Sequence, residues 1–422
     1  MALQHEKGGA MRVIRKRCLG LDLHKQQNTA YLRVHQGSDR EPIGIREQFG
    51  TMPEDLERLR DWVVEHQVTD VVMESTSVYW MHLYEMLEAV THPAVVNASH
   101  VKKVPGRKTD VTDAEWLAEL HAHGLLRLSF VPPKEIRRLR ALTRYRSKLV
   151  ALRTGARNRT IKLVEMAGIK LSSVATDSFG KTGRLILDAL CREKADPAQL
   201  AAQAKGKLRR KIPALEQALR HPLAPHQRDL LALHLQAHDM IDAQVAHVEH
   251  QLSALVHPYQ DAIAKLDAIP GINPLAAITL LAETGVDMSV YRNDRHLTSI
   301  AGLAPGNAIS ADKRRRIGVS KGNRHLKRIC VQIAWAASRK KDSFLRARFL
   351  RLQARIGRPK AIVALARQLL VVVFHVLSND RPYTDLGPNF YVTRHKERAA
   401  ENYVKRLTKL GFNVTLTMNT DH

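Results

Sequence analysis

Cysteine is scarce in this chain of 422 residues, which contains only Cys18, Cys191 and Cys330. The three lie far apart and none belongs to a CxxC pair, which argues against both a disulfide framework and a structural zinc site. At this length, two or three domains can each bury a core without such cross-links. The cysteine usage favours a reducing compartment, and we expect the protein in the cytoplasm.

Long hydrophobic runs are missing as well. Residues 1–17 contain no apolar core of the kind that a signal peptide requires. The most apolar late segment, residues 361–377, carries Arg367 and His375 and falls short of a membrane-spanning length. We therefore expect a buried helix there and no membrane partner.

Acidic and aromatic residues are both few. The chain has 67 Lys and Arg against 41 Asp and Glu, so its formal net charge is +26 and its isoelectric point lies near 10.2. Such an excess makes nucleic acid the natural partner, because each neutralised phosphate releases condensed counterions. Aromatic residues make up only 5% of the chain, so base stacking is not expected to be the main mode of contact.

Two acidic residues stand within or directly after apolar segments. Residues 18–34 have the pattern of a β-hairpin with Asp22 in its first strand, and a later buried strand, residues 70–73, is followed directly by Glu74. A carboxylate in such a place is costly to bury unless a basic side chain or a metal ion binds it. The expected element order, β-β-β-α-β-α-β, is that of a ribonuclease H-type α/β fold.

A pair of aspartates, Asp110 and Asp113, follows in the segment TDVTDAEWLAEL. We predict a helix that begins at residues 109–110, so that the two carboxylates share one face while Trp116 points into the core. Taken alone, this DxxD spacing is best explained as an acid-rich first helical turn. Together with Asp22 and Glu74, however, the carboxylates would suffice to hold two divalent cations about 4 Å apart, an arrangement suited to in-line displacement at phosphorus.

The middle of the chain is predicted to be helical. Residues 134–166 form a long basic helix suited to a phosphate backbone, and residues 225–256 carry an apolar stripe that indicates either a coiled-coil strut or dimer seam, or ordinary core packing. We predict a metal-binding α/β domain (1–130), a basic helical or coiled-coil insert (131–260), a mainly helical C-terminal domain (261–388) and a tail (389–422).

The third segment contains candidate DNA-processing residues. The IPGI sequence at 269–272 suggests a helix-hairpin-helix whose backbone N–H groups meet a phosphate. Residues 305–307 are predicted to form a turn and Ser310 to lie in a polar loop. A serine among cations is a candidate nucleophile, and the basic cluster around it would bind a scissile phosphate. The cluster consists of Lys313, Arg314, Arg315, Arg316, Lys321, Arg324, Lys327 and Arg328.

With these motifs in view, the chain resembles the DEDD-type serine transposases of bacterial insertion sequences, recombinases that work with a bridge RNA. GLDLHK, VVMEST and KTDVTDAEWLAEL are similar to the family's RuvC-like metal domain, and IPGI, AGLAP and GVSKGNRHLKR to its C-terminal transposase domain. The resemblance implies a metal tetrad of Asp22, Glu74, Asp110 and Asp113 and a nucleophile at Ser310. Ala311 follows this serine where the family usually has glycine, and Ser320 is the rival nucleophile.

The resemblance further implies Mg²⁺ as cofactor, with two ions and Mn²⁺ as a substitute, and strand exchange through a phosphoserine linkage. The implied partners are donor and target DNA, a structured guide RNA that specifies the DNA by base pairing, and further copies of the chain in a dimer or tetramer. Two alternatives stay open. One is a Mg²⁺-dependent RuvC-like nuclease or junction resolvase that uses water, and the other is a nucleic-acid-binding protein without catalysis.

Overall fold

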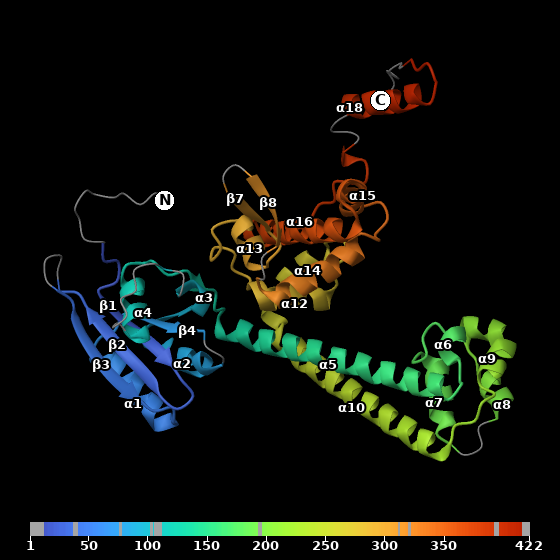
Figure 1. The fold of residues 1–422 in the computed structure, drawn as a ribbon, viewed down its shortest axis with the longest axis horizontal. Helices are drawn as coiled ribbons and strands as arrows, with labels where there is room; N and C mark the ends of the chain where they lie inside the picture. The colour runs from blue at the N-terminus through green and yellow to red at the C-terminus, as the bar shows by residue number, and fades with distance from the viewer. Residues whose placement is uncertain are drawn as a thin grey trace. The chain divides into compact units, whose positions relative to one another are not determined.

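Two compact units make up the chain, residues 1–134 and residues 135–422 (Figure 1). The predicted division into four segments is finer than this and stays a prediction. The computed structural model describes residues 12–36, 41–75, 78–101, 104, 112–192, 196–310, 313–319, 322–391 and 396–415.

A mixed six-stranded sheet forms the centre of the first unit, in the order β3-β2-β1-β4-β5-β6. Strands β1, β2 and β3 form an antiparallel meander, β4 and β5 run parallel to β1, and β6 pairs antiparallel with β5. The prediction of an α/β N-terminal region is confirmed, and the strand order agrees with a ribonuclease H-type sheet. The strands are β1 (Arg17–Leu23), β2 (Asn28–Val34), β3 (Ile43–Phe49), β4 (Asp70–Glu74), β5 (His92–Val96) and β6 (Leu128–Ser129).

Helices cover both faces of this sheet, so β1 is buried along most of its length. On one face, Leu19, Leu21 and Leu23 pack with Leu59 of α1 and Leu83 of α2. On the other, Val72 and Val96 pack with Trp116, Leu117 and Leu120 of α4, and the predicted inward orientation of Trp116 is confirmed. The helices are α1 (Pro53–Glu65), α2 (Tyr79–Leu87), α3 (Ala98–Val101) and α4 (Asp113–Ala122).

The second unit contains two long helices, α5 (Lys134–Met166) and α10 (Pro225–Leu255). They run side by side in opposite directions (Figure 1). Ion pairs and hydrogen bonds join them, among them Arg146 to Glu249 and Arg157 to His238. Apolar residues of the predicted α10 stripe, such as Val248 and Leu252, pack with Leu149 of α5, so packing within one chain accounts for this part of the stripe.

A small helical cluster lies between these two helices in sequence, and its apolar residues, among them Ile186 and Leu215, form one core with Val164 of α5 and Leu231 of α10. Its elements are α6 (Leu171–Val174), α7 (Lys181–Leu190), α8 (Pro197–Ala202), the 3-10 helix η1 (Gly206–Lys211) and α9 (Ile212–Ala218).

The rest of the second unit is built around α16 (Arg358–Ser378), which contacts α11, α13, α14 and α15. Among the described helices, only α16 is long and apolar enough to cross a membrane, which by itself is weak evidence because a core helix passes the same test. Leu365, Leu369 and Val373 are buried within this bundle. The remaining described helices of the second unit are η2 (His257–Tyr259), α11 (Gln260–Asp267), α12 (Pro274–Thr284), α13 (Asp294–Ile300), α14 (Arg324–Ala337), α15 (Phe344–Ile356) and α18 (Lys396–Lys409).

A β-hairpin occupies the segment for which a turn and a polar loop were predicted. Strand β7 (Pro305–Ser310) pairs antiparallel with β8 (Lys313–Val319), with a register shift between Pro305 and Asn307. The prediction of a turn at residues 305–307 is therefore wrong. Pro-Gly-Asn is typical of a turn, but proline is also compatible with the first position of a strand, where its missing N–H donor is not needed for pairing. Pro305 occupies that position in β7.

Candidate functional site

The carboxylates Asp22 and Glu74 lie at the same edge of the sheet. Strands β1 and β4 run parallel, and their last paired residues are Leu21 and Met73, so Asp22 and Glu74 are the next residues on adjacent strands. Both also belong to the face that α4 covers, because side chains alternate along a strand and Gly20 and Val72 face α4. The Asp22 side chain is 27% exposed, which leaves it accessible to a ligand.

Gly20 allows α4 to approach this edge closely. A Cβ atom on Gly20 would lie 2.0 Å from the carbonyl oxygen of Ala114 and 2.7 Å from the nitrogen of Ala118, so the α4 backbone rests directly on β1. Asp113, the first residue of α4, immediately precedes Ala114. Three of the four predicted tetrad residues therefore come from adjoining elements on one side of the sheet.

The start of α4 corrects the sequence prediction. Thr112 has extended backbone angles, and its side chain accepts a hydrogen bond from the N–H of Glu115, so Thr112 is the N-cap and the helix begins at Asp113. A helix running continuously from residues 109–110 is thus wrong, and helical spacing does not place Asp110 beside Asp113. Asp110 itself lies outside the described residues.

The donor set fits a divalent cation in its chemistry, because carboxylate oxygens are the ligands that Mg²⁺ prefers. The close approach of α4 at Gly20 and the partial exposure of Asp22 also fit such a site. Within the described part of the chain, no group of three or more His, Cys, Asp and Glu side chains is arranged to hold an ion. The tetrad therefore stays a prediction.

His24 is a neighbour of Asp22 for which the sequence favours a solvent-facing turn position over a place at the metal site. Its Nε2 atom lies 3.1 Å from Oδ2 of Asp22, while 68% of its side chain is exposed. His24 is positioned to orient the Asp22 carboxylate.

Ser310 is the last residue of β7 and pairs with Lys313, so it lies at the closed end of the β7–β8 hairpin and not in a polar loop. The description of the hairpin extends to the backbone of Ser310 and of Lys313, Arg314, Arg315 and Arg316. Lys321 and the rival Ser320 lie outside the described residues. Arg324, Lys327 and Arg328 lie in the first turns of α14, where Arg324 and Arg328 are exposed.

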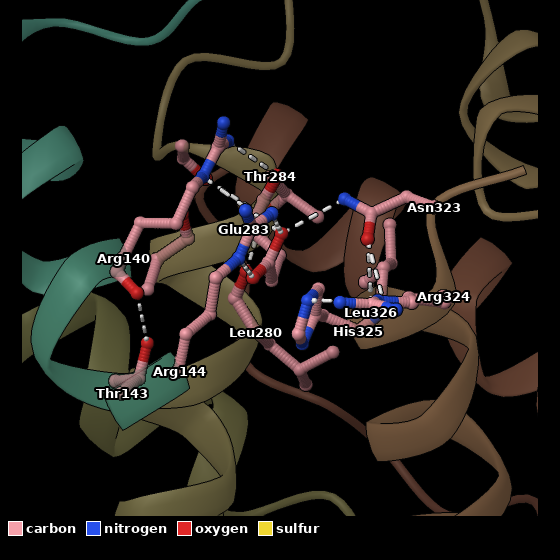
Figure 2. A network of polar contacts seen from close by, with 12 residues as sticks. Arg140, Thr143, Arg144, Leu280, Glu283, Thr284, Asn323, Arg324, His325 and Leu326 are labelled. Carbon is pink, nitrogen blue, oxygen red and sulfur yellow. Dashed lines mark hydrogen bonds and ion pairs between the residues drawn. The ribbon is translucent and has the colours of Figure 1, made fainter. Parts of the chain in front are cut away.

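A buried carboxylate, Glu283, anchors the segment that follows this hairpin (Figure 2). Only 1% of its side chain is exposed, and it accepts hydrogen bonds from Nε and Nη2 of Arg144 at 2.7 and 2.8 Å. Asn323 donates to Glu283 at 2.8 Å, and its own side-chain oxygen caps α14 by accepting from the N–H groups of His325 and Leu326. One carboxylate thus joins α5, α12 and the start of α14.

The charge of Glu283 is balanced by arginines from the long helix α5. Burial by itself would raise the pKa of Glu283, but the hydrogen bonds from Arg144 and Asn323 outweigh it and hold that pKa below its usual value. Arg140 reinforces the contact by donating to the backbone carbonyls of Ala282 and Glu283 at 2.8 and 2.9 Å. The sequence analysis missed this network, whose only signal was one acid in the apolar helix α12.

A basic cavity of about 160 Å³ adjoins this network, between α5, the N-terminus of α12 and α14. Its lining includes Arg144, Arg146, His325 and Arg328. Burial, together with the nearby Arg144, lowers the pKa of His325. The hairpin between α11 and α12 rests on α14, because a Cβ on Gly271 would lie 2.5 Å from the nitrogen of Ala337. A helix-hairpin-helix contact with phosphate stays a prediction.

Comparisons with known proteins give a match in the N-terminal part of the chain and another in the C-terminal part. A family model for transposases of the DEDD, IS110 type matches residues 19–168, and one described as the transposase IS116/IS110/IS902 family matches residues 263–349. The chain is similar to the transposase for insertion sequence element IS1111A of Coxiella burnetii, with 25% identity over 76% of this chain and 81% of that protein. A probable family 20 transposase of Pseudomonas aeruginosa is 27% identical over 86% of this chain and 98% of its own length.

These matches identify the class of protein as a transposase. Its α/β unit carries the acidic residues described above, and its helical unit carries the basic clusters. The first matched region covers most of the α/β unit and continues through α5, the second lies within the second unit, and together they cover more than half of the chain. The chain belongs to the IS110/IS116 family of insertion-sequence transposases.

Proposed function

We propose that this protein cuts and rejoins DNA strands at an insertion sequence by metal-assisted serine transesterification, guided by a bridge RNA. The observation that carries the proposal most is the placement of Asp22 and Glu74 at one edge of adjacent parallel strands, with Asp113 at the start of the helix that rests on Gly20. Nuclease and transferase sites of the ribonuclease H type need acidic groups at such an edge.

Asp22, Glu74 and Asp113, together with Asp110, would hold two Mg²⁺ or Mn²⁺ ions, which would neutralise charge on the reacting phosphate. By holding the ions in fixed positions, these carboxylates would also determine where the phosphate binds. His24, in contact with Asp22, would keep that carboxylate in one rotamer.

Ser310 is the proposed nucleophile. Its Oγ would form a bond to phosphorus while one phosphate ester bond of the DNA breaks, and the proton lost by the serine is balanced by the one gained at the released strand end. The phosphoserine linkage conserves the ester bond, so a strand hydroxyl can attack it and rejoin the DNA without a high-energy cofactor. Arg324, Lys327 and Arg328 and the basic strand β8 supply counter-charge for the phosphate.

The partners proposed are donor and target DNA, a structured guide RNA and further copies of the chain, in the cytoplasm. The net charge of +26 supports binding of both nucleic acids. Base pairing in the RNA, rather than side chains, would select the DNA site.

Trapping a covalent protein–DNA adduct tests this proposal. The protein is incubated with Mg²⁺, the guide RNA transcribed from the flanking sequence and end-labelled DNA, and adducts are separated on a denaturing gel. We expect an adduct that Ser310→Ala abolishes and that the matched control Ser320→Ala retains. Asp22→Asn should lose both cleavage and adduct while DNA binding is kept.

The other outcomes identify the alternatives. Cleavage without an adduct, unchanged in Ser310→Ala, would identify a nuclease or resolvase that uses water. Nucleic-acid binding with no cleavage, and with no effect of Asp22→Asn, would identify a binding protein without catalysis.

A further inference from the structure

A second basic cavity, of about 380 Å³, lies on α15 and has no part in the site described above. It is lined by Arg348, Arg351, Leu352, Arg355 and Tyr391. The three arginines have the i, i+3, i+7 spacing that places them along one face of a helix, separated by roughly 5 and 6 Å along its axis. Arg351, Arg355 and Tyr391 lie beyond residues 263–349, the segment that the second family model matches.

The positive charge of this face is not balanced nearby. The sequence of α15 contains no acidic residue, and within the described residues none of its arginines forms a salt bridge with Asp or Glu. Nε of Arg348 is buried and has no hydrogen-bond partner among the described atoms. A guanidinium with an unused buried donor, beside two more arginines, is a ready site for an anion.

Tyr391 is brought to α15 by a folded-back segment that follows α16. Asp385 accepts a hydrogen bond from the N–H of Phe344 at 2.8 Å, and the Tyr391 ring stacks on Phe344 with centroids 5.5 Å apart. Nη1 of Arg348 donates to the Tyr391 hydroxyl at 2.9 Å, while the guanidinium of Arg351 lies 4.7 Å from the ring centroid. These contacts hold two arginine side chains in place before any ligand arrives.

The same contacts decide what kind of ligand fits. Since Phe344 and Arg351 already cover the Tyr391 ring, the ring is poorly placed to stack a nucleobase. What the cavity offers is guanidinium donors, which match phosphate oxygens in planar pairs. We propose that this cavity binds one or two phosphate groups of a nucleic-acid backbone, as a contact separate from the basic cluster at residues 313–328. The inference rests on the proposed function only in that it requires a nucleic-acid partner.

The salt dependence of binding tests the proposal, measured with fluorescent duplex DNA and, in a second arm, with a structured RNA carrying the same number of phosphates. Arg348→Gln, Arg351→Gln and Arg355→Gln are combined in one full-length chain. Each lost phosphate contact should flatten the slope of log K against log salt by about 0.9 on duplex DNA and about 0.7 on single strands. We expect a loss of one to two contacts, on DNA, on RNA or on both, and the arm that changes identifies the source of the phosphate.

A matched control removes the same charge elsewhere. Lys207, Arg209 and Arg210 are exposed in η1, far from α15 in sequence, and their combined change to glutamine should leave the slope near that of the wild type. An equal loss in both triple variants, or no loss in the α15 variant, would overturn the site.

A milder variant guards against a folding defect. Arg351→Gln with Arg355→Gln leaves the Arg348–Tyr391 contact intact, involves only exposed side chains and should still flatten the slope by about one contact. Wild-type protein that binds neither probe would overturn this site and the proposed function together. If the wild-type protein binds and cleaves, and the α15 variant has the same salt slope as the η1 control, only the α15 site is refuted.

Discussion

At the scale of single residues, the position of most consequence in the second unit is Glu283. Its carboxylate is almost completely buried, which by itself would raise its pKa, but the hydrogen bonds that Arg144 and Asn323 donate hold that pKa below its ordinary value (Figure 2). A buried charge of this kind is stabilised by its hydrogen-bond partners. Removing one partner leaves the other group buried and uncompensated, so the loss of stability is larger than the net contribution of the intact pair.

Replacing Glu283 with glutamine should therefore destabilise the protein at neutral pH by about 2–3 kcal/mol, since Arg144 is itself partly exposed and can regain some hydration. Urea unfolding measures this loss. Asp242→Asn is the matched control, because it breaks a pair with Arg153 in which the Asp242 side chain is 53% exposed, and should cost less than about 1 kcal/mol. Equal effects of the two variants would contradict the argument.

The pH dependence of the same variant has a definite sign. The pKa of Glu283 is lower in the folded chain than its ordinary value, so its contribution to stability is present above that ordinary value and is lost as the pH falls through the folded-state pKa. The difference in stability between the wild type and Glu283→Gln should shrink as the pH is lowered from 7 toward 3.

At the scale of elements, the contact between α4 and β1 determines where the first unit places its acidic groups. Gly20 has no side chain to separate the two, so the first turn of α4, which begins after the N-cap Thr112, rests on β1 through Ala114. A longer side chain in the strand would push the helix, and Asp113 with it, away from Asp22.

Gly20→Ala should lower stability by roughly 1–3 kcal/mol or more, because its Cβ would meet the backbone of Ala114, which cannot rotate away. Mg²⁺-dependent cleavage should fall more steeply than nucleic-acid binding. Gly318→Ala in β8 is the matched strand control, since no atom lies within 4 Å of the Cβ it would add. Thermal melting and the cleavage assay check both variants; a Gly20→Ala protein with wild-type melting and cleavage would refute the role given to this contact.

At the scale of the whole molecule, the proposed chemistry divides between the two units. The carboxylates belong to residues 1–134 and Ser310 to residues 135–422. The long antiparallel helices α5 and α10 lie between the α/β unit and the C-terminal bundle in sequence. The hypothesis that follows from this separation in sequence is a composite site, in which Ser310 of one copy would act on a phosphate bound at the acidic site of another.

Mixing two inactive variants tests this division, provided that the proposed serine chemistry is correct. Ser310→Ala and Asp22→Asn subunits are each expected to be inactive, but a mixture should regain part of the wild-type strand cleavage, because some sites would combine the intact serine of one with the intact carboxylates of the other. Titrating one variant against the other measures the recovery. No recovery at any ratio would show that both groups act within a single copy.

Local pattern was sufficient for much of the secondary structure. The helix at Lys134–Met166 begins and ends where the sequence predicts, and the strand predicted at residues 70–73 is observed one residue longer, as Asp70–Glu74. These elements depend on hydrophobic spacing and on turn residues within a few positions, which a sequence displays directly. Asp22 and Glu74 were found for the same reason.

The errors fall where distant residues decide the structure. The predicted turn at 305–307 became part of β7 because its partner strand β8 pairs with it, and α4 starts later than predicted because Thr112 caps it. The Glu283 network and the α15 cavity each join residues more than thirty positions apart, so local pattern does not show which side chains meet there. The sequence by itself thus determined the elements, the charge and the strand-end acids of this transposase. The tertiary structure decided which of these groups meet, because packing and hydrogen bonding act between residues that the chain alone keeps apart.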